Sequence, residues 1–477
     1  MTIEQDMETG ENTMQEKVRE PLIQSGGDGV SKGTKERMWM VYFSTFVAVC
    51  GSFAFGSCIG FSSPTQSAIR EDLDLSLAEY SLFGSILNFG AMIGAITSGI
   101  IADYIGRKGA MRIAAISCIA GWFVIYFAEG ALALDIGRLL TGYGMGVISY
   151  VVPIFIAEIA PKNLRGGLTT ANQLMICCGV AVSFIIGTVL TWRALALTGL
   201  IPCLVLLLGL FFIPESPRWL AKVGRQKEFD AALHKLRGKD VDISQEAAEI
   251  QDYIETLEKL PKAKLLDLFQ GRYLRSVRIG VGLMVVQQFG GINGFCFYAS
   301  EIFVSVGFSA VVGSISFACL QVVVTALGAT LMDKAGRRPL LLVSASGLVV
   351  GCILVGTSFF LKAQGLASTV YPMLAVTGIL VYIGSFSVGM GATPWVIMSE
   401  IFPINVKGVA GSLATLVNWI GAWTVSFTFN FLISWSTYGT FIIYAAINVL
   451  GILFIAMFVP ETKGRTLEEI QAAINNS

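Results

Sequence analysis

Long apolar runs alternate with short polar stretches along most of this chain. A helix that crosses about 30 Å of hydrocarbon needs about 20 consecutive apolar residues, and twelve runs approach or exceed that length. They cover approximately residues 38–61, 79–102, 110–128, 132–158, 168–190, 194–213, 276–304, 310–332, 339–361, 371–399, 407–431 and 436–459. Six runs lie on each side of a polar break, so the pattern predicts an all-α membrane protein with twelve transmembrane helices in two six-helix halves.

The polar stretches divide the chain into five parts. We expect a disordered N-terminal tail (1–37), a first six-helix half (38–213), a linker domain (214–275), a second half (276–459) and a C-terminal tail (460–477). In the linker, apolar residues recur every three or four positions, which is typical of short amphipathic helices.

Most cations between the runs lie in the loops of one side. These loops hold Arg107, Lys108, Lys162, Lys334 and Lys463, whereas the opposite loops mix cations with acids. Because short cytoplasmic loops carry an excess of Lys and Arg, we expect both termini and the linker to be cytoplasmic.

Two stretches in corresponding places repeat each other. Residues 99–108 read GIIADYIGRK and residues 330–338 read TLMDKAGRR. Each copy places an Asp, a Gly and two cations at the end of an apolar run. Repeated bundles of spans commonly carry a solute between them, which favours transport. Each cluster can act as a latch that holds one face shut, or can simply anchor the spans.

Composition narrows the possible functions. The chain has 477 residues, 54% hydrophobic and 14% charged, and Lys plus Arg equals Asp plus Glu at 33 each. The balance gives no reason to expect a nucleic acid partner. His234 is the only histidine and lies in a polar segment, and the nine cysteines fall in apolar runs without C-x-x-C spacing. We therefore expect no metal site, no cofactor and no enzymatic activity.

Polar amides interrupt the apolar runs in both halves. They are Gln173, Gln287, Gln288, Asn293 and Asn418. A buried amide costs free energy unless it is hydrogen-bonded, and it both donates and accepts, as a neutral polyol ligand requires. Trp395 can offer a flat face to a sugar ring, and Phe55 and Tyr298 can line the same cavity. The alternative is that these amides join helices to each other.

Arg138 lies several residues inside the fourth run. An ionisable residue within a span is by default a functional hypothesis, and Asp135, one turn earlier, is the candidate partner. The alternative is an arginine that extends to the interface. The glycine-rich runs Gly142 to Gly146 and Gly384 to Gly391 predict close helix packing or local bending.

The N-terminal tail contains one candidate targeting signal. The segment 18–23, VREPLI, looks like an acidic dileucine-type signal that directs plant membrane proteins to the vacuole. It predicts sorting adaptors as partners and the vacuolar membrane rather than the plasma membrane. The alternative is a disordered tail with two chance aliphatic residues.

Several strings together resemble a known family. They are GRLLTG (137–142), PIFIAEIAP (153–161), PESPRWL (214–220), QQFGGIN (287–293), SEIFP (399–403) and PETKG (460–464). From about residue 38 to 470 the chain resembles the sugar porter branch of the major facilitator superfamily, and most closely its plant early-dehydration-responsive-like monosaccharide transporters.

The resemblance implies a rocker-switch transporter in the bilayer, with a cytoplasmic helical domain between its halves and a central site for glucose or a similar hexose. We expect a monomer. By motif position Gln173, Gln287, Gln288, Asn293, Trp395 and Asn418 contact the sugar. The resemblance also implies a cytoplasmic charge network that stabilises the outward-open state, formed by Asp103, Arg107, Glu158, Arg165, Glu215, Arg218, Asp333, Arg337, Glu400 and Glu461.

One departure from the family pattern bears on energy coupling. Proton-coupled members carry an Asp just after a Phe-Gly pair in the first span, whereas here Phe55-Gly56 is followed by Ser57 and Cys58. We therefore expect facilitated diffusion. A proton-coupled hexose symporter that exports sugar from the vacuole, through Asp135 or Glu301, is the alternative, and a non-transporting sugar sensor is a third possibility.

Overall fold

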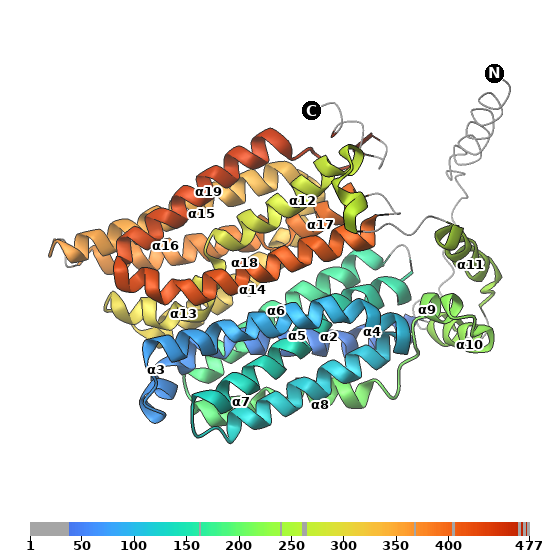
Figure 1. The fold of residues 1–477 in the computed structure, drawn as a ribbon, viewed down its shortest axis with the longest axis horizontal. Helices are drawn as coiled ribbons and strands as arrows, with labels where there is room; N and C mark the ends of the chain where they lie inside the picture. Colours follow the sequence, from blue (N-terminus) through green and yellow to red (C-terminus); the bar gives the residue numbers. More distant parts are fainter. Residues whose placement is uncertain are drawn as a thin grey trace.

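The structure, a computed structural model, describes residues 38–161, 164–238, 241–259, 265–366, 369–402, 406–465, 469–470 and 474. The predicted N-terminal tail and its sorting signal lie outside these residues. The described residues form helices and no strand. Helices α2 to α8 form one bundle and α12 to α19 a second, and α9 to α11 lie at one end (Figure 1). We call this the linker end, and the other the far end.

The helices follow in chain order. The first bundle holds α2 (Trp39–Gly60), α3 (Ser62–Asp72), α4 (Leu77–Tyr126), α5 (Ala131–Ile159), α6 (Arg165–Gly187), α7 (Trp192–Thr198) and α8 (Leu200–Gly209). The linker holds α9 (Pro217–Lys222), α10 (Gln226–Arg237) and α11 (Ser244–Lys259), followed by the short 3₁₀ helix η2 (Leu265–Phe269). The second bundle holds α12 (Gly271–Phe289), α13 (Ile292–Ser305), α14 (Ala310–Ala335), α15 (Arg337–Ala363), α16 (Tyr371–Ser385), the π-helix η3 (Phe386–Met390), α17 (Thr393–Ile401), α18 (Lys407–Trp435) and α19 (Thr437–Phe458).

The predicted all-α, twelve-span fold is confirmed. Among the described residues, eleven helical segments are long and apolar enough to cross a membrane. One of them, α4, has 50 residues and would measure about 75 Å at 1.5 Å per residue, over twice the bilayer core. Non-helical Gly106 (φ 84°, ψ 171°) divides it into two spans, which brings the total to twelve.

Two predicted spans are broken near their middles. Gly290 and Gly291 separate α12 from α13, and Gly291 has φ 104°, which favours glycine. The π-helix η3 separates α16 from α17 inside the run 371–399. Glycines from 384 to 391 therefore accompany local bending, one of the two outcomes that their sequence predicts.

Close packing is the outcome in the other glycine-rich run. A Cβ added at Gly142 or Gly146 would collide with the backbone of α4, at Leu87 O and Ala91 O respectively. Glycine therefore lets α5 approach α4 backbone to backbone. Between the two bundles, α4 packs against α18, and α6 packs against α14.

Candidate functional site

Three of the predicted amides form one hydrogen-bonded chain at the α12–α13 break. Asn293 Nδ2 donates to Gln288 Oε1 at 2.6 Å, and Gln288 Nε2 donates to Asn418 Oδ1 at 2.6 Å. Gln288 and Asn418 are buried. Among the described residues this chain leaves the Asn418 NH₂ group and the Asn293 carbonyl oxygen unused, so it offers a donor at one end and an acceptor at the other.

Gln287 joins the two broken spans. Its Nε2 donates to Met390 O at 2.6 Å and to Gly391 O at 3.0 Å, the carbonyls at the end of η3. Its Oε1 is buried, and no hydrogen-bond partner for it lies in the part of the chain that the structure describes. A buried carbonyl without a donor costs about 1–3 kcal/mol, so Gln287 Oε1 favours binding of a hydroxyl.

The first bundle contributes less than the sequence suggests. Gln173 is half-buried, and its Nε2 lies 3.9 Å from Cys177 Sγ on the same helix. Phe55 reaches the second bundle, because its ring centroid lies 6.2 Å from that of Trp419, the neighbour of Asn418. Phe55 therefore stands near the amide chain, whereas the contacts of Gln173 remain within α6.

The two remaining aromatic candidates differ in position. Trp395 is 36% exposed and lies in the first turn of α17, which begins at Thr393. Tyr298 is buried, stacks on Phe429 with centroids 5.0 Å apart, and donates its hydroxyl to Ser426 O at 3.2 Å. In this conformation Tyr298 packs on α18, away from the amides.

Two further polar groups were not predicted from the sequence to belong to the site. Trp419 Nε1 and Gln321 Oε1 are buried, and neither has a hydrogen-bond partner among the described residues. Gln321 lies one turn before Thr325, which meets Cys177 of the first bundle across a 3.4 Å Oγ1–Sγ contact. The available signals were the adjacency of Trp419 to Asn418 and the mid-run position of Gln321.

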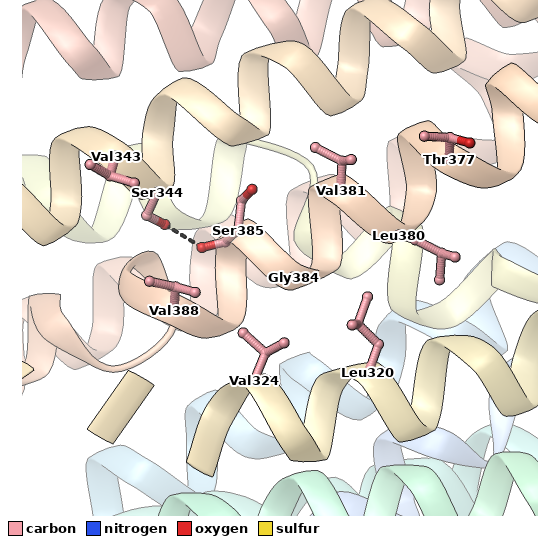
Figure 2. A pocket seen from close by; sticks show the side chains of 10 residues that line it. All are labelled: Leu320, Val324, Val343, Ser344, Thr377, Leu380, Val381, Gly384, Ser385 and Val388. Carbon is pink, nitrogen blue, oxygen red and sulfur yellow. Dashed lines mark hydrogen bonds between the residues drawn. The ribbon is translucent and has the colours of Figure 1, made fainter. Parts of the chain in front are cut away.

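The larger of the two described cavities lies elsewhere. It has a volume of about 560 Å³ and is lined by α14, α15, α16 and η3. Figure 2 shows its mostly aliphatic walls, with Ser344 donating to Ser385 O at 2.6 Å. None of the predicted sugar-binding residues lines it. Its apolar walls suit hydrocarbon rather than a polyol, so the amide chain remains the candidate sugar site.

A charge network occupies the linker end of the first bundle. Arg107 makes a bidentate ion pair with Glu158, at 2.9 Å from Nε and 2.8 Å from Nη2, and its Nη1 contacts Asp103 at 3.2 Å. Glu215 accepts from the backbone N–H groups of Arg107 and Lys108. Burial raises the pKa of Glu215, and hydrogen bonds from the Ser216 and Lys108 N–H groups oppose that rise.

The second bundle repeats this network. Arg337 Nη2 pairs with Glu400 at 3.1 Å, and Glu461 accepts from the N–H groups of Arg337 and Arg338 at 3.0 and 3.1 Å. Burial opposes ionisation of Glu461, but the backbone N–H groups of Lys463, Arg337 and Arg338 outweigh it and lower the pKa of this carboxyl.

The turn glycines explain why both networks have the same geometry. Gly106 has φ 84° and ψ 171°, and Gly336 has φ 91° and ψ 166°. In this conformation, which is essentially restricted to glycine, the next two N–H groups point at one carboxylate. A Cβ would lie 2.5 Å from Glu215 Oε2 at Gly106, and 2.7 Å from Glu461 Oε2 at Gly336.

Three predicted network residues are not part of these contacts. The Arg218 guanidinium lies over the Tyr253 ring, 5.4 Å from its centroid, beside a cavity of about 230 Å³ that Glu158 also lines. The side chains of Arg165 and Asp333 lie outside what the structure describes. Among the described residues no ion pair joins the two bundles at the linker end.

Apart from the Cys177–Thr325 contact, the hydrogen bonds that join the bundles among the described residues lie towards the far end. Asn88 Nδ2 donates to Ser426 Oγ at 2.8 Å, and Asn430 Nδ2 donates to Ser81 Oγ at 2.9 Å. Ser63 Oγ donates to Ser300 Oγ at 3.0 Å. Uncharged side chains therefore hold the bundles together at this end.

Arg138 is fully buried and has no carboxylate partner among the described residues. Its guanidinium donates to Cys58 O at 2.8 Å and to Ser62 Oγ, and it lies over the Phe83 ring at 4.9 Å. The structure does not pair it with Asp135, whose Oδ1 is buried without a hydrogen-bond partner. Arg138 therefore connects α5 to α2 and α3 rather than extending to the membrane surface.

Comparisons with known proteins agree with this architecture. The family model described as "Sugar (and other) transporter" matches residues 44–474. The chain is 69% identical to "Sugar transporter ERD6-like 7" of Arabidopsis thaliana, over 96% of this chain and 98% of that protein. It is 62% identical to "Sugar transporter ERD6-like 16" of the same plant, with 98% of each chain covered.

The fold also matches a solved transporter. The structure of the major facilitator superfamily proton:xylose symporter XylE, bound to 6-bromo-6-deoxy-D-glucose, aligns with a TM-score of 0.76 and 29% identity, covering 92% of this chain and 99% of that one. These relatives are transporters rather than enzymes. The repeated charge networks, the broken spans and the family match together establish that this chain belongs to the sugar transporters of the major facilitator superfamily.

Proposed function

We propose that this protein carries a monosaccharide, glucose or a similar hexose, across a membrane by alternating access. The observation that carries the proposal is the amide chain Asn293–Gln288–Asn418 with its unused donor and acceptor, beside the unpartnered Gln287 Oε1. A sugar hydroxyl both donates and accepts, so a ring of hydroxyls satisfies both kinds of group.

The indole and phenyl groups beside the amides support a sugar as the ligand. Trp419 Nε1 supplies a further buried donor, and the rings of Phe55, Trp419 and Trp395 offer apolar faces to the C–H surface of the sugar. Gln173 joins this set if the first bundle rotates towards the amides during the transport cycle. Tyr298 supports the far-end contact Asn88–Ser426 from within the second bundle, because it donates to Ser426 O.

Alternating access is supported by the asymmetry between the two ends. The far end is closed by hydrogen bonds such as Asn88–Ser426, while at the linker end no ion pair of the described residues joins the bundles. We assign the linker end and both termini to the cytoplasm, which makes this conformation inward-facing. On the tail signal at 18–23 we assign the protein to the vacuolar membrane, with sorting adaptors as partners.

Facilitated diffusion is the favoured mode of transport. Arg138 donates to a backbone carbonyl and a serine hydroxyl and faces no carboxylate among the described residues, so no titrating partner stands beside it. The second candidate is proton-coupled export, which the buried, unpartnered Oδ1 of Asp135 favours.

Counterflow in proteoliposomes tests both statements. The protein should drive transient uptake of labelled glucose into liposomes preloaded with unlabelled sugar, at a rate that an imposed pH gradient leaves unchanged. If a proton gradient drives glucose accumulation against its own gradient, and Asp135→Asn abolishes this accumulation, the protein is a proton symporter and not a facilitator. If the protein binds glucose saturably but shows no flux, the transport hypothesis is wrong and the protein is a sugar sensor.

A further inference from the structure

Three cations converge where α8 ends at the linker end. Lys108 Nζ donates to Ile213 O at 2.6 Å, and Lys235 Nζ donates to Phe212 O at 2.8 Å. The Arg112 guanidinium lies over the Phe211 ring, 5.3 Å from its centroid. Because their contacts fall on three consecutive residues, we treat Lys108, Arg112 and Lys235 as one cluster and call it the cation cluster.

Among the described residues no carboxylate makes an ion pair with the side chains of this cluster, although the charge of Glu215 is close enough to act on Lys108. Within the part of the chain that the structure describes, the ammonium groups of the two lysines donate to backbone carbonyls. Arg112 has no hydrogen-bond or ion-pair partner among the described residues, and its Nε is buried without one. The nearest acid in the network, Glu215, accepts from the backbone N–H groups of Arg107, Lys108 and Ser216 and is committed to the turn.

The second copy of the internal repeat shows that the charge network forms without a full equivalent of this cluster. In the second bundle Arg338 takes the place of Lys108, and its Nη2 donates to Ala456 O at 2.5 Å. Leu342 stands where the first bundle has Arg112, at the same interval of 230 residues that relates Gly106 to Gly336. The second network forms without an equivalent of Arg112, so the first network does not require Arg112 either.

The cluster lies at the edge of the apolar surface. Phe211 is 66% exposed and Phe212 is 65% exposed, and Leu208, one turn earlier on α8, is 61% exposed. Large apolar side chains this exposed at the end of a span face lipid, and lysines and arginines near helix ends extend to the interface. Lys235 is exposed beside them, which puts cationic groups at headgroup depth.

We propose that the cation cluster binds the phosphate of an anionic phospholipid headgroup in the leaflet at the linker end, with the acyl chains along Phe211 and Phe212. Basic pockets beside spans bind anionic headgroups in this way. The proposal goes beyond sugar transport and does not depend on which sugar is carried.

Lipid titration of the purified full-length protein tests the proposal. The protein in detergent is titrated with phosphatidylglycerol, and apparent affinity is taken from the rise in its unfolding temperature. Each Lys or Arg near an anionic surface contributes about 5-fold in affinity, so Arg112→Gln with Lys235→Gln should weaken phosphatidylglycerol binding roughly 30-fold. Phosphatidylcholine should give no comparable stabilisation.

Matched variants separate binding from folding. Lys227→Gln removes an exposed lysine of the same helix α10 and should bind phosphatidylglycerol as the wild type does. Arg112→Lys with Lys235→Arg keeps both charges and should retain most of the affinity. Equal affinity of the wild type and the double Gln variant for phosphatidylglycerol would overturn the proposal. It would also be overturned if inorganic phosphate alone stabilised the protein as much as the lipid does, because the site would then bind free anions.

Discussion

Substituting Gly106 with Ala perturbs the turn on which the first charge network depends. The backbone there has φ 84° and ψ 171°, a region that costs a non-glycine residue about 1–3 kcal/mol. The new Cβ would also lie 2.5 Å from Glu215 Oε2 and displace that carboxylate from at least one N–H group. A hydrogen bond to a charged group contributes about 1.5–3 kcal/mol.

Together these effects predict that Gly106→Ala lowers the free energy of unfolding by roughly 2.5–6 kcal/mol. Gly336→Ala should act in the same range, because its φ is 91° and its Cβ would lie 2.7 Å from Glu461 Oε2. The assay is denaturant or thermal unfolding of the purified full-length protein, followed by tryptophan fluorescence.

Gly167→Ala is the matched control. Gly167 lies in α6 with no atom within 4 Å of its Cβ position, so Ala should stabilise the helix by about 0.5–1 kcal/mol. Equal unfolding free energies for Gly106→Ala and Gly167→Ala would refute the account of the turn.

Three further outcomes are expected. Glu158→Gln removes the charge of the part-buried ion pair with Arg107 and should lower the free energy of unfolding by about 1.5–3 kcal/mol, measured by the same unfolding assay. The pKa of Asp72 is lowered by hydrogen bonds from Arg193 and Trp192, so its stabilisation is present above the ordinary value of 3.8 and is lost as pH falls through the lowered value. Asp72→Asn should therefore destabilise the protein equally at pH 5.5 and pH 7, whereas a difference that vanishes at pH 5.5 would contradict this. Asn88→Ala removes the hydrogen bond to Ser426 that helps to close the far end. A cysteine introduced at the far end should therefore be alkylated faster in this variant than in the protein that keeps Asn88.

The lengths of the apolar runs predicted the spans because a backbone that crosses lipid can adopt few structures. Every N–H and C=O group in hydrocarbon must be satisfied internally, so apolar length alone locates α2, α5 and α19 to within a residue or two at most boundaries. The repeat around Gly106 and Gly336 was equally visible, since an Asp, a Gly and two cations recur after an apolar run.

Other features depend on distant partners and left no periodic signal. The π-helix η3 and the break at Gly291 lie inside runs whose mean hydropathy still fits one span, so hydropathy alone does not locate them, and the glycines at 384–391 indicated only bending or close packing. The amides were found because they are polar within apolar runs, but their partners were not, since Gln287 bonds to carbonyls about 100 residues away. The choice of Asp135 as partner of Arg138 relied on helical spacing, whereas the guanidinium turns towards α2 and α3.

The central claim is that the amide chain at the α12–α13 break binds the transported sugar, and counterflow of labelled glucose through Gln288→Leu tests it most directly. Gln288 donates one hydrogen bond of the chain and accepts the other, so counterflow should fall at least about tenfold, the equivalent of losing about one hydrogen bond, while unfolding shows an intact fold. Gln251→Leu, at an exposed amide of α11, should transport as the wild type does. Wild-type counterflow by a folded Gln288→Leu variant would contradict the claim.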